Sequence, residues 1–167
     1  ADTRIAEYRA VALKLAQEEA EFKSQKMHAE SEAEIRREIL EARETMIGRV
    51  LDAVRTKLGE IAGDPVRGRE LLLSFAIDGT NVVSSEAVRL VVRADQKKWV
   101  DARFLDEVRT KTGKRVELSD ESLEAIGGVV VMSTDGRERF DNTLDNRLAR
   151  RIPDVRAMIW ARLSHAG

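Results

Sequence analysis

The chain has 167 residues, of which 43% are apolar, 35% are charged and only 4% are aromatic. Its 29 basic and 30 acidic residues nearly cancel, so no overall field draws the protein to nucleic acid or to a membrane surface. The absence of cysteine excludes a disulfide framework, a thiol nucleophile and a cysteine zinc site. No stretch approaches the roughly 18 consecutive apolar residues of a membrane span. Many charged and few aromatic residues are typical of exposed helix, so we expect a globular part and an extended helical part.

The first third of the chain predicts one long helix. Residues 1–47 contain neither glycine nor proline and are dominated by good helix formers such as Glu, Ala, Lys and Arg. Gly48 is the first interruption, and the first real stop is the GEIAGDP segment at 59–65. Glu19 with Lys23 and Glu32 with Arg36 stand four residues apart in the favourable order. The expected helix covers residues 1–60 and is about 85 to 90 Å long.

Apolar residues on this helix form a narrow stripe whose period changes along the chain. The first half takes alternating steps of three and four but is interrupted by Glu19 and Lys26. The second half averages about 3.7 residues per step, which suits a straight or right-handed pairing. From this stripe we predict a partner-helix interface that consists of Leu15, Phe22, Ala29, Ala33, Ile35, Ile39, Ala42, Met46 and Val50.

A narrow stripe on a long helix cannot be buried by the helix alone. Two arrangements would cover it, namely a partner helix or a return of the helix onto its own domain. The sequence favours a partner, because residues 16–34 contain too few large apolar side chains for a bundle helix.

Residues 64–167 predict a small globular domain that begins with helices and strands in alternation. Asp64 followed by Pro65 predicts the start of a helix that ends at Gly79. A strand at 87–94 follows, then a helix from a cap at Asp95 to Gly113, then a short strand at 115–119. The side chains expected to be buried are Val66, Leu71, Leu72, Phe75, Ala76, Val88, Leu90, Val92, Trp99, Val100, Phe104, Leu105, Val108, Val116 and Leu118.

The stretch after this predicts a hairpin and a last helix. Gly127 and Gly128 indicate a bulge or a close backbone approach before a strand at 129–132. Asp135-Gly136 predicts a primed hairpin turn into a strand at 137–140. Asn142 or Thr143 then caps a helix with Leu144, Leu148 and Ile152 inward, which Pro153 breaks or restarts. The predicted fold class is therefore α+β, with a long N-terminal helix and a domain with a roughly four-stranded sheet.

No group of residues predicts catalysis, a cofactor or a metal. TKTGKR at 110–115 lacks the first glycine and the final Ser or Thr of a phosphate loop, and Asp135, Glu138 and Asp141 lack the spacing of a calcium loop. His28 and His165, the only histidines, are expected to be solvated. QKKWV at 96–100 is better explained by exposed lysines beside a buried Trp99 than by nucleic-acid binding. The basic tail at 147–162 suits either an acidic protein partner or a solvated helix face.

The stretch GGVVVMSTDGRERFDNTLDNRL resembles the C-terminal signature of the E subunit of V-type and A-type rotary ATPases. In that family Gly-Gly and an apolar strand precede Asp-Gly, a second strand, Asn-Thr-Leu and Arg-Leu. The matching residues are Gly127, Gly128, Asp135, Gly136, Asn142, Thr143, Leu144, Arg147 and Leu148. IPDVRAMIW at 152–160 is similar to the Pro-x-x-Arg ending of some members, about one turn closer to Arg-Leu.

The resemblance implies a non-catalytic peripheral stalk. The long helix would pair with the helical G subunit in a right-handed coiled coil, and the globular domain would hold the catalytic head, with Arg156 and Trp160 as candidate contacts. The stalk would act as a stator that couples ATP hydrolysis or synthesis to ion transport, on the cytoplasmic side and peripheral to the membrane. The chain starts without Met and is short in the helix, so the resemblance also implies a missing N-terminal piece.

Three other hypotheses stay open. A stator-like regulator of a secretion or flagellar ATPase would have a similar architecture but should lack the Asp-Gly and Asn-Thr-Leu signature. A small enzyme would need a pocket constellation that the sequence does not show. A nucleic-acid adaptor would bind with a steep salt dependence.

Overall fold

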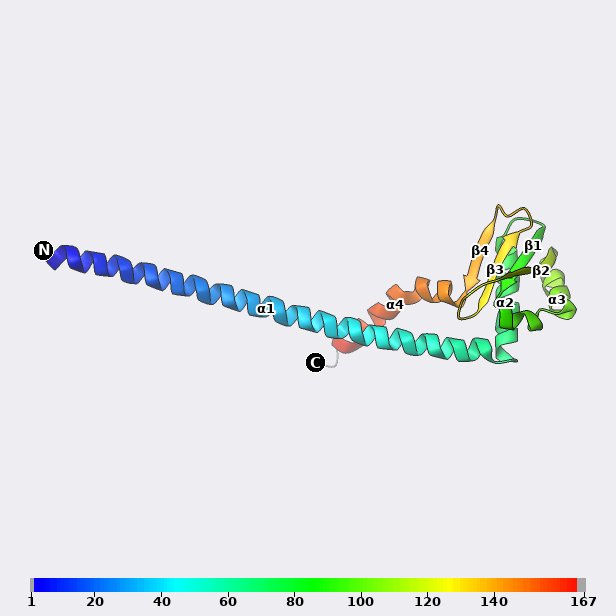
Figure 1. The fold of residues 1–167 in the computed structure, drawn as a ribbon, viewed down its shortest axis with the longest axis horizontal. Helices are drawn as coiled ribbons and strands as arrows, with labels where there is room; N and C mark the ends of the chain where they lie inside the picture. Colours follow the sequence, from blue (N-terminus) through cyan, green and yellow to red (C-terminus); the bar gives the residue numbers. More distant parts are fainter. Residues whose placement is uncertain (1, 165–167) are drawn as a thin grey trace. The chain divides into compact units, whose positions relative to one another are not determined.

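The fold is that of a computed structural model, which describes residues 2–164, so His165 lies outside the described residues. The elements in chain order are α1 (Asp2–Gly63), α2 (Arg67–Val82), β1 (Ala87–Val92), the 3-10 helix η1 (Ala94–Trp99), α3 (Ala102–Thr112), β2 (Arg115–Ser122), β3 (Gly128–Ser133), β4 (Arg139–Thr143) and α4 (Leu144–Ser164) (Figure 1). The predicted α+β fold, with a long first helix and a four-stranded sheet, is confirmed. None of the described helices has the length and apolar character needed to cross a membrane.

Helix α1 spans 62 residues, and Gly48 and Gly59 do not interrupt it. The predicted long helix is thus confirmed, and it tolerates Gly48 because one glycine costs a helix only about 1 kcal/mol relative to alanine. The predicted ion pairs form, with 3.6 Å from Lys23 to Glu19 and 3.2 Å from Arg36 to Glu32. The chain separates into two compact units, residues 1–48 and 49–167.

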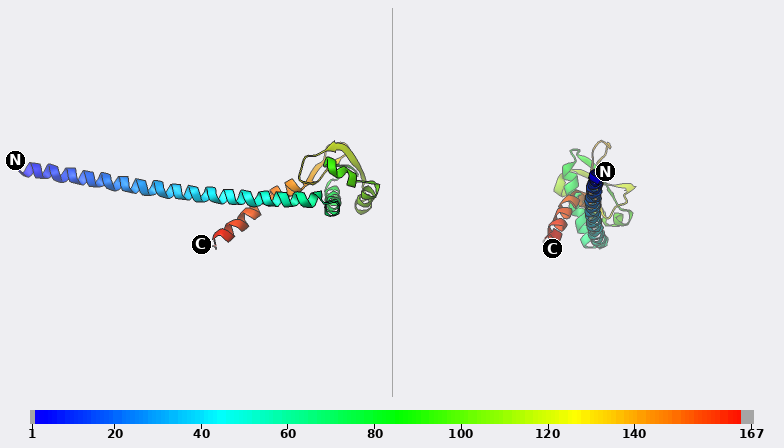
Figure 2. Two further views of the ribbon diagram at one scale, coloured as in Figure 1. Left: turned by 60° about the horizontal axis from the view of Figure 1, so that its bottom comes forward. Right: turned by 90° about the vertical axis from the view of Figure 1, so that its left-hand side faces the viewer.

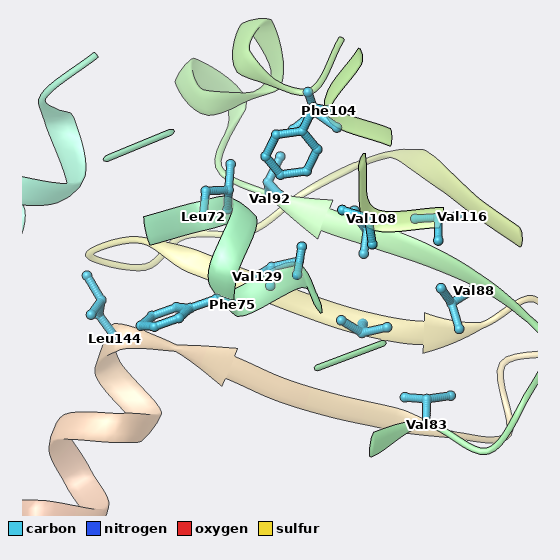
Figure 3. Packing of buried hydrophobic residues seen from close by; sticks show 14 of the residues in the cluster. Leu72, Phe75, Val83, Val88, Val92, Phe104, Val108, Val116, Val129 and Leu144 are labelled. Carbon is cyan, nitrogen blue, oxygen red and sulfur yellow. The ribbon is translucent and has the colours of Figure 1, made fainter. Parts of the chain in front are cut away.

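The sheet of the second unit has the strand order β2-β1-β3-β4, with β1 and β2 parallel and the other neighbours antiparallel. Helix α2 packs on β3 and β4, and α3 packs on β2 (Figure 2). Val88, Leu90 and Val92 of β1 are buried as predicted, but Val91 is buried as well, so the predicted alternation holds only in part. Figure 3 shows the interior shared by the two helices and the sheet, with Leu72, Phe75, Phe104, Val108, Val88, Val92, Val116 and Val129.

Helix α2 starts as predicted but ends later than predicted. The Asp64 carboxylate accepts hydrogen bonds from the backbone N–H groups of Val66, at 3.0 Å, and Arg67, at 2.8 Å, as a helix cap does. These bonds, Arg67 first, hold the pKa of Asp64 below its ordinary value. The helix continues past Gly79 to Val82 because its last carbonyls are satisfied by the Lys114 ammonium, which donates to Thr80 and Val83. Val66 is exposed, contrary to prediction.

The single helix predicted from Asp95 to Gly113 is two elements. The 3-10 helix η1 ends at Trp99, and α3 begins after Asp101, whose carboxylate accepts from the Phe104 N–H at 2.8 Å. Asp101, a second capping residue inside the apolar pattern, therefore starts a new helix where the pattern alone predicted one continuous helix. Gly113 closes α3 in the left-handed region at φ 71°, as expected.

The hairpin forms between the predicted strands but with a different turn. No described residue other than glycine has positive φ, so the primed turn expected at Asp135-Gly136 was wrong. The Gly136 N–H instead donates to the Ser133 carbonyl at 2.9 Å, with Gly136 at φ 72°, and β4 starts later than predicted, at Arg139. The predicted break or restart at Pro153 was wrong, since α4 runs through it to Ser164. A proline removes one hydrogen bond of the helix and can kink it without ending it.

The last turn of α1 belongs to the core of the second unit. Ala62 is 1% exposed, and its carbonyl accepts from the buried Gln96 side-chain amide at 2.9 Å. A Cβ on Gly68 would lie 2.5 Å from the Ala62 carbonyl oxygen, and one on Gly127 would lie 2.6 Å from the Ala62 Cβ. The end of α1 is thus held by contacts that only small residues allow.

Gly128 serves the close backbone approach that the paired glycines predicted. Its φ is 95°, and an added Cβ would lie 2.7 Å from the Asn142 carbonyl oxygen. Gly136 has a similar left-handed conformation with open space around it. A comparison of alanine variants at the two positions therefore separates the cost of a left-handed backbone from the cost of the steric clash at Gly128.

Replacement of these two glycines by alanine should destabilise the second unit unequally. Gly136→Ala should cost about 1–2 kcal/mol, the penalty of a left-handed alanine. Gly128→Ala should cost about 1–3 kcal/mol more, because the methyl group meets backbone that cannot move aside. Urea unfolding followed by the fluorescence of Trp99 and Trp160 measures both, and equal losses would contradict the close approach.

Candidate functional site

Except for Asp135 and Gly136, the signature residues lie where the start of β3, the end of β4 and the start of α4 meet. Gly127 and Gly128 lead into β3, Asn142 and Thr143 end β4, and Leu144 begins α4. The Leu144 N–H donates to the Gly127 carbonyl at 2.9 Å, which ties the helix start to the glycine pair. Leu144 and Leu148 are buried, whereas Asp135 and Gly136 lie in the exposed turn of the hairpin. The signature therefore brings together the ends of three elements.

Asn142 and Arg147 link β4, α4 and α2 through polar contacts. Asn142 is 1% exposed, and its side-chain amide donates to the Phe75 carbonyl at 2.9 Å. Its side-chain oxygen accepts from an Arg147 guanidinium nitrogen at 3.0 Å. The Arg147 guanidinium also lies over the Phe75 ring, 4.3 Å from its centroid, in cation–π geometry. Both signature residues thus join α4 to α2.

Thr143, one of the two residues predicted to cap the last helix, is the cap. Its hydroxyl accepts from the Asn146 N–H at 3.2 Å and donates to the Asp141 carboxylate at 2.6 Å. Asn146 in turn donates from its side chain to the Asp141 carbonyl at 2.7 Å. The start of α4 is therefore fixed in position relative to β4.

Asp135 organises the hairpin turn. The Ser133 hydroxyl donates to its carboxylate at 2.6 Å and the Arg137 N–H at 3.0 Å, and these bonds, Ser133 first, lower the pKa of Asp135. A lowered pKa means that the contribution to stability is present above the ordinary pKa of Asp and is lost as the pH falls through the lowered one. Within residues 2–164 no three His, Cys, Asp or Glu side chains lie close enough together to hold a metal ion.

The side chains predicted to form the partner-helix interface are exposed. Every residue from 4 to 42 is exposed, and Met46 and Val50 are exposed as well. The exposed fraction is 60% for Leu15, 68% for Phe22 and 55% for Ile35. Ile47 and Leu51, which the predicted stripe omitted, are buried. The spacing of Ile47 and Leu51, four residues apart, was a signal that could have found them.

The candidates on α4 are less exposed than the basic tail suggested. Arg156 and Trp160 are half-buried, one turn apart. Arg150 and Arg151 are exposed and line a groove of about 520 Å³ together with Asp78, Val82, Phe140, Asn142, Arg147 and Asp154. Sequence reasoning found the arginines of this groove but missed Asp78, Val82 and Phe140, because only the fold brings α2 and β4 to them.

A comparison with protein families identifies the chain. The family described as ATP synthase (E/31 kDa) subunit matches residues 2–163, so the chain belongs to this family. The resemblance seen in the hairpin and last helix is thus confirmed over nearly the whole chain.

Three archaeal relatives agree with this assignment. The E subunit of the A-type ATP synthase of Methanopyrus kandleri is 36% identical over 144 residues, which cover 84% of this chain and 70% of that protein. The corresponding protein of Thermococcus gammatolerans is 36% identical over 128 residues, with 75% and 62% covered, and that of Thermococcus kodakarensis is 35% identical over 139 residues, with 78% and 66% covered. The chain thus spans between 62% and 70% of the length of these relatives.

The contacts of Asn142 and Arg147 should prove energetically coupled. Asn142→Ala should cost about 1–3 kcal/mol, because it removes two hydrogen bonds at a buried site. The double variant with Arg147→Ala should lose less than the sum of the single losses, with a coupling of about 0.5–3 kcal/mol. Urea unfolding measures the cycle.

Arg139→Lys is the matched control, since Arg139 is exposed on the same strand and should change stability by less than about 0.5 kcal/mol. Simple additivity of the Asn142 and Arg147 losses would show that the two side chains do not act together.

Proposed function

We propose that the protein is a non-catalytic peripheral-stalk component of an A-type rotary ATPase. In this proposal α1, over residues 1–60, pairs with the helical G subunit, and residues 64–167 bind the catalytic head. The stalk holds the head against the torque of the rotor and so couples ATP hydrolysis or synthesis to ion transport. It lies on the cytoplasmic side and meets the membrane only through the complex.

The observation that carries the proposal is the exposure of the apolar stripe on α1. Residues 4–42 form an uninterrupted helix in which even Phe22 is 68% exposed. The ion pairs along it lie at the surface, where each contributes about 0.3–0.5 kcal/mol. Burial of one large apolar side chain contributes about 1.5–3 kcal/mol, so a partner helix along the stripe would stabilise α1 far more than its own pairs do.

The second unit supports a role in load transfer. Ala62 and Gln96 join the end of α1 to the unit that contains the sheet, and Asn142 and Arg147 join α4 to α2. Force applied along α1 would therefore reach the sheet and α4 through packed and hydrogen-bonded groups. Arg156 and Trp160 of α4 are the proposed contacts to the head. Membership of the ATP synthase family supports this function over a regulator of a secretion or flagellar ATPase.

Pairing should depend on which leucine of α1 is changed. The full chain alone should self-associate, and co-expression with its small helical partner should give a soluble 1:1 heterodimer. Leu15→Glu should weaken this pairing at least about tenfold, since it replaces an apolar group of the stripe by a charge. Sedimentation equilibrium of the co-expressed chains measures the effect.

Leu13 provides a matched control, because it is 64% exposed, close to the 60% of Leu15, but lies off the predicted stripe. Leu13→Glu should leave pairing within about twofold. A stable compact monomer, or equal effects at both leucines, would refute the predicted interface. Cross-linking of the intact heterodimer to the isolated catalytic head then separates the stalk function from the regulator hypothesis.

A further inference from the structure

One arginine that lines the groove between α2, β4 and α4, Arg147, is held in place by its neighbours. The Arg147 side chain is held by the Phe75 ring, at 4.3 Å, and by the Asn142 side-chain oxygen, at 3.0 Å. A guanidinium carries five N–H donors, and this hydrogen bond uses one of them. Arg147 is nevertheless exposed, so its remaining donors are available to a ligand in the groove. An arginine fixed in this way loses little entropy when it binds a carboxylate with two parallel hydrogen bonds.

Two further charges in the groove are uncompensated. Among residues 4–162, whose side chains the structure describes, nothing forms an ion pair or a side-chain hydrogen bond with Arg150, and the same holds for Asp78 of α2. Arg151 and Asp154 do pair, at 3.3 Å, but both are exposed, where such a pair contributes about 0–1 kcal/mol. The groove thus offers positive charge on α4 and one separate negative charge on α2.

The groove also has two apolar side chains in its lining. Val82 at the end of α2 is 58% exposed, and Phe140 of β4 is half-buried. Both line the same groove as the arginines. An exposed valine beside an aromatic ring can take up an apolar side chain of a partner, which would remove both from water.

We propose that this groove binds a mixed-charge helical segment of a partner protein. A carboxylate of the segment binds Arg147 and Arg150, an apolar side chain packs on Val82 and Phe140, and a Lys or Arg pairs with Asp78. The charges of the groove are complementary to such a segment and not to a polyphosphate, which Asp78 and Asp154 would repel. The proposal requires a protein partner but not the stalk function.

A designed peptide tests the groove directly. The probe is a fluorescent helical peptide of about 15 residues in an Ala/Gln background, with Glu, Leu and Lys at spacings of three to four on one face. A second probe carries the three residues in the reverse order, and a control probe has Gln in place of Glu. Fluorescence anisotropy with the 167-residue chain should show that a probe with one of the two residue orders binds, and that its control probe binds at least about fivefold more weakly.

Variants of the chain locate the binding. Arg150→Gln and Asp78→Asn should each weaken binding about fivefold or more, whereas Arg103→Gln, an exposed arginine on α3, should change it less than about twofold. Leu15→Glu should leave it unchanged, and Arg150→Gln should leave pairing along α1 unchanged, which separates this proposal from the stalk function. Failure of both probes, insensitivity to Arg150→Gln, or tighter binding of tripolyphosphate than of the peptide would overturn the proposal.

Discussion

The attachment of Ala62 to its surroundings is the contact on which the rest of the second unit depends. A helix of 62 residues can act on a small domain only if its end is fixed there, and Ala62 is where this occurs. Its carbonyl, free of an internal partner so close to the helix end, is satisfied by the Gln96 amide. Gly68 and Gly127 approach it so closely that neither could carry a side chain. The two glycines therefore allow the close packing of Ala62, Gly68 against its carbonyl oxygen and Gly127 against its Cβ.

A second set of contacts, which adjoins Ala62 through Gly127, explains the signature residues. Asn142 and Arg147 connect β4 and α4 with Phe75 of α2, and Thr143 fixes the first turn of α4. Each of these residues has a structural contact that accounts for it. The signature residues thus position α4 relative to β4 and α2. The same arrangement forms the groove that we propose as a partner site.

The fold class could be predicted from the sequence because its signals were local. Uninterrupted helix formers predicted α1, and alternation predicted β1. The errors arose where a tertiary contact or a second cap overrode the pattern. Asp101 divided one expected helix into two, and Lys114 extended α2 past Gly79.

The candidate site was predictable only in part, for the same reason. The arginines of the groove stand close together in sequence, whereas Asp78, Val82 and Phe140 reach them only through the fold. The predicted stripe placed Met46 on the interface and omitted Ile47, although the spacing of Ile47 and Leu51 was a sequence signal for the burial of both. The partner-helix interface itself stays a prediction, since its residues are exposed and their partner is a second chain.

The most direct test of the account is amide hydrogen exchange along α1, with and without the helical partner. If α1 is fixed at Ala62 and depends on a partner elsewhere, residues 58–63 should be protected in the chain alone, while residues 4–42 exchange rapidly. Addition of the partner should extend protection over residues 4–42, because pairing removes the local opening of the helix. Strong protection of residues 4–42 in a monomeric chain, unchanged by the partner, would contradict the account.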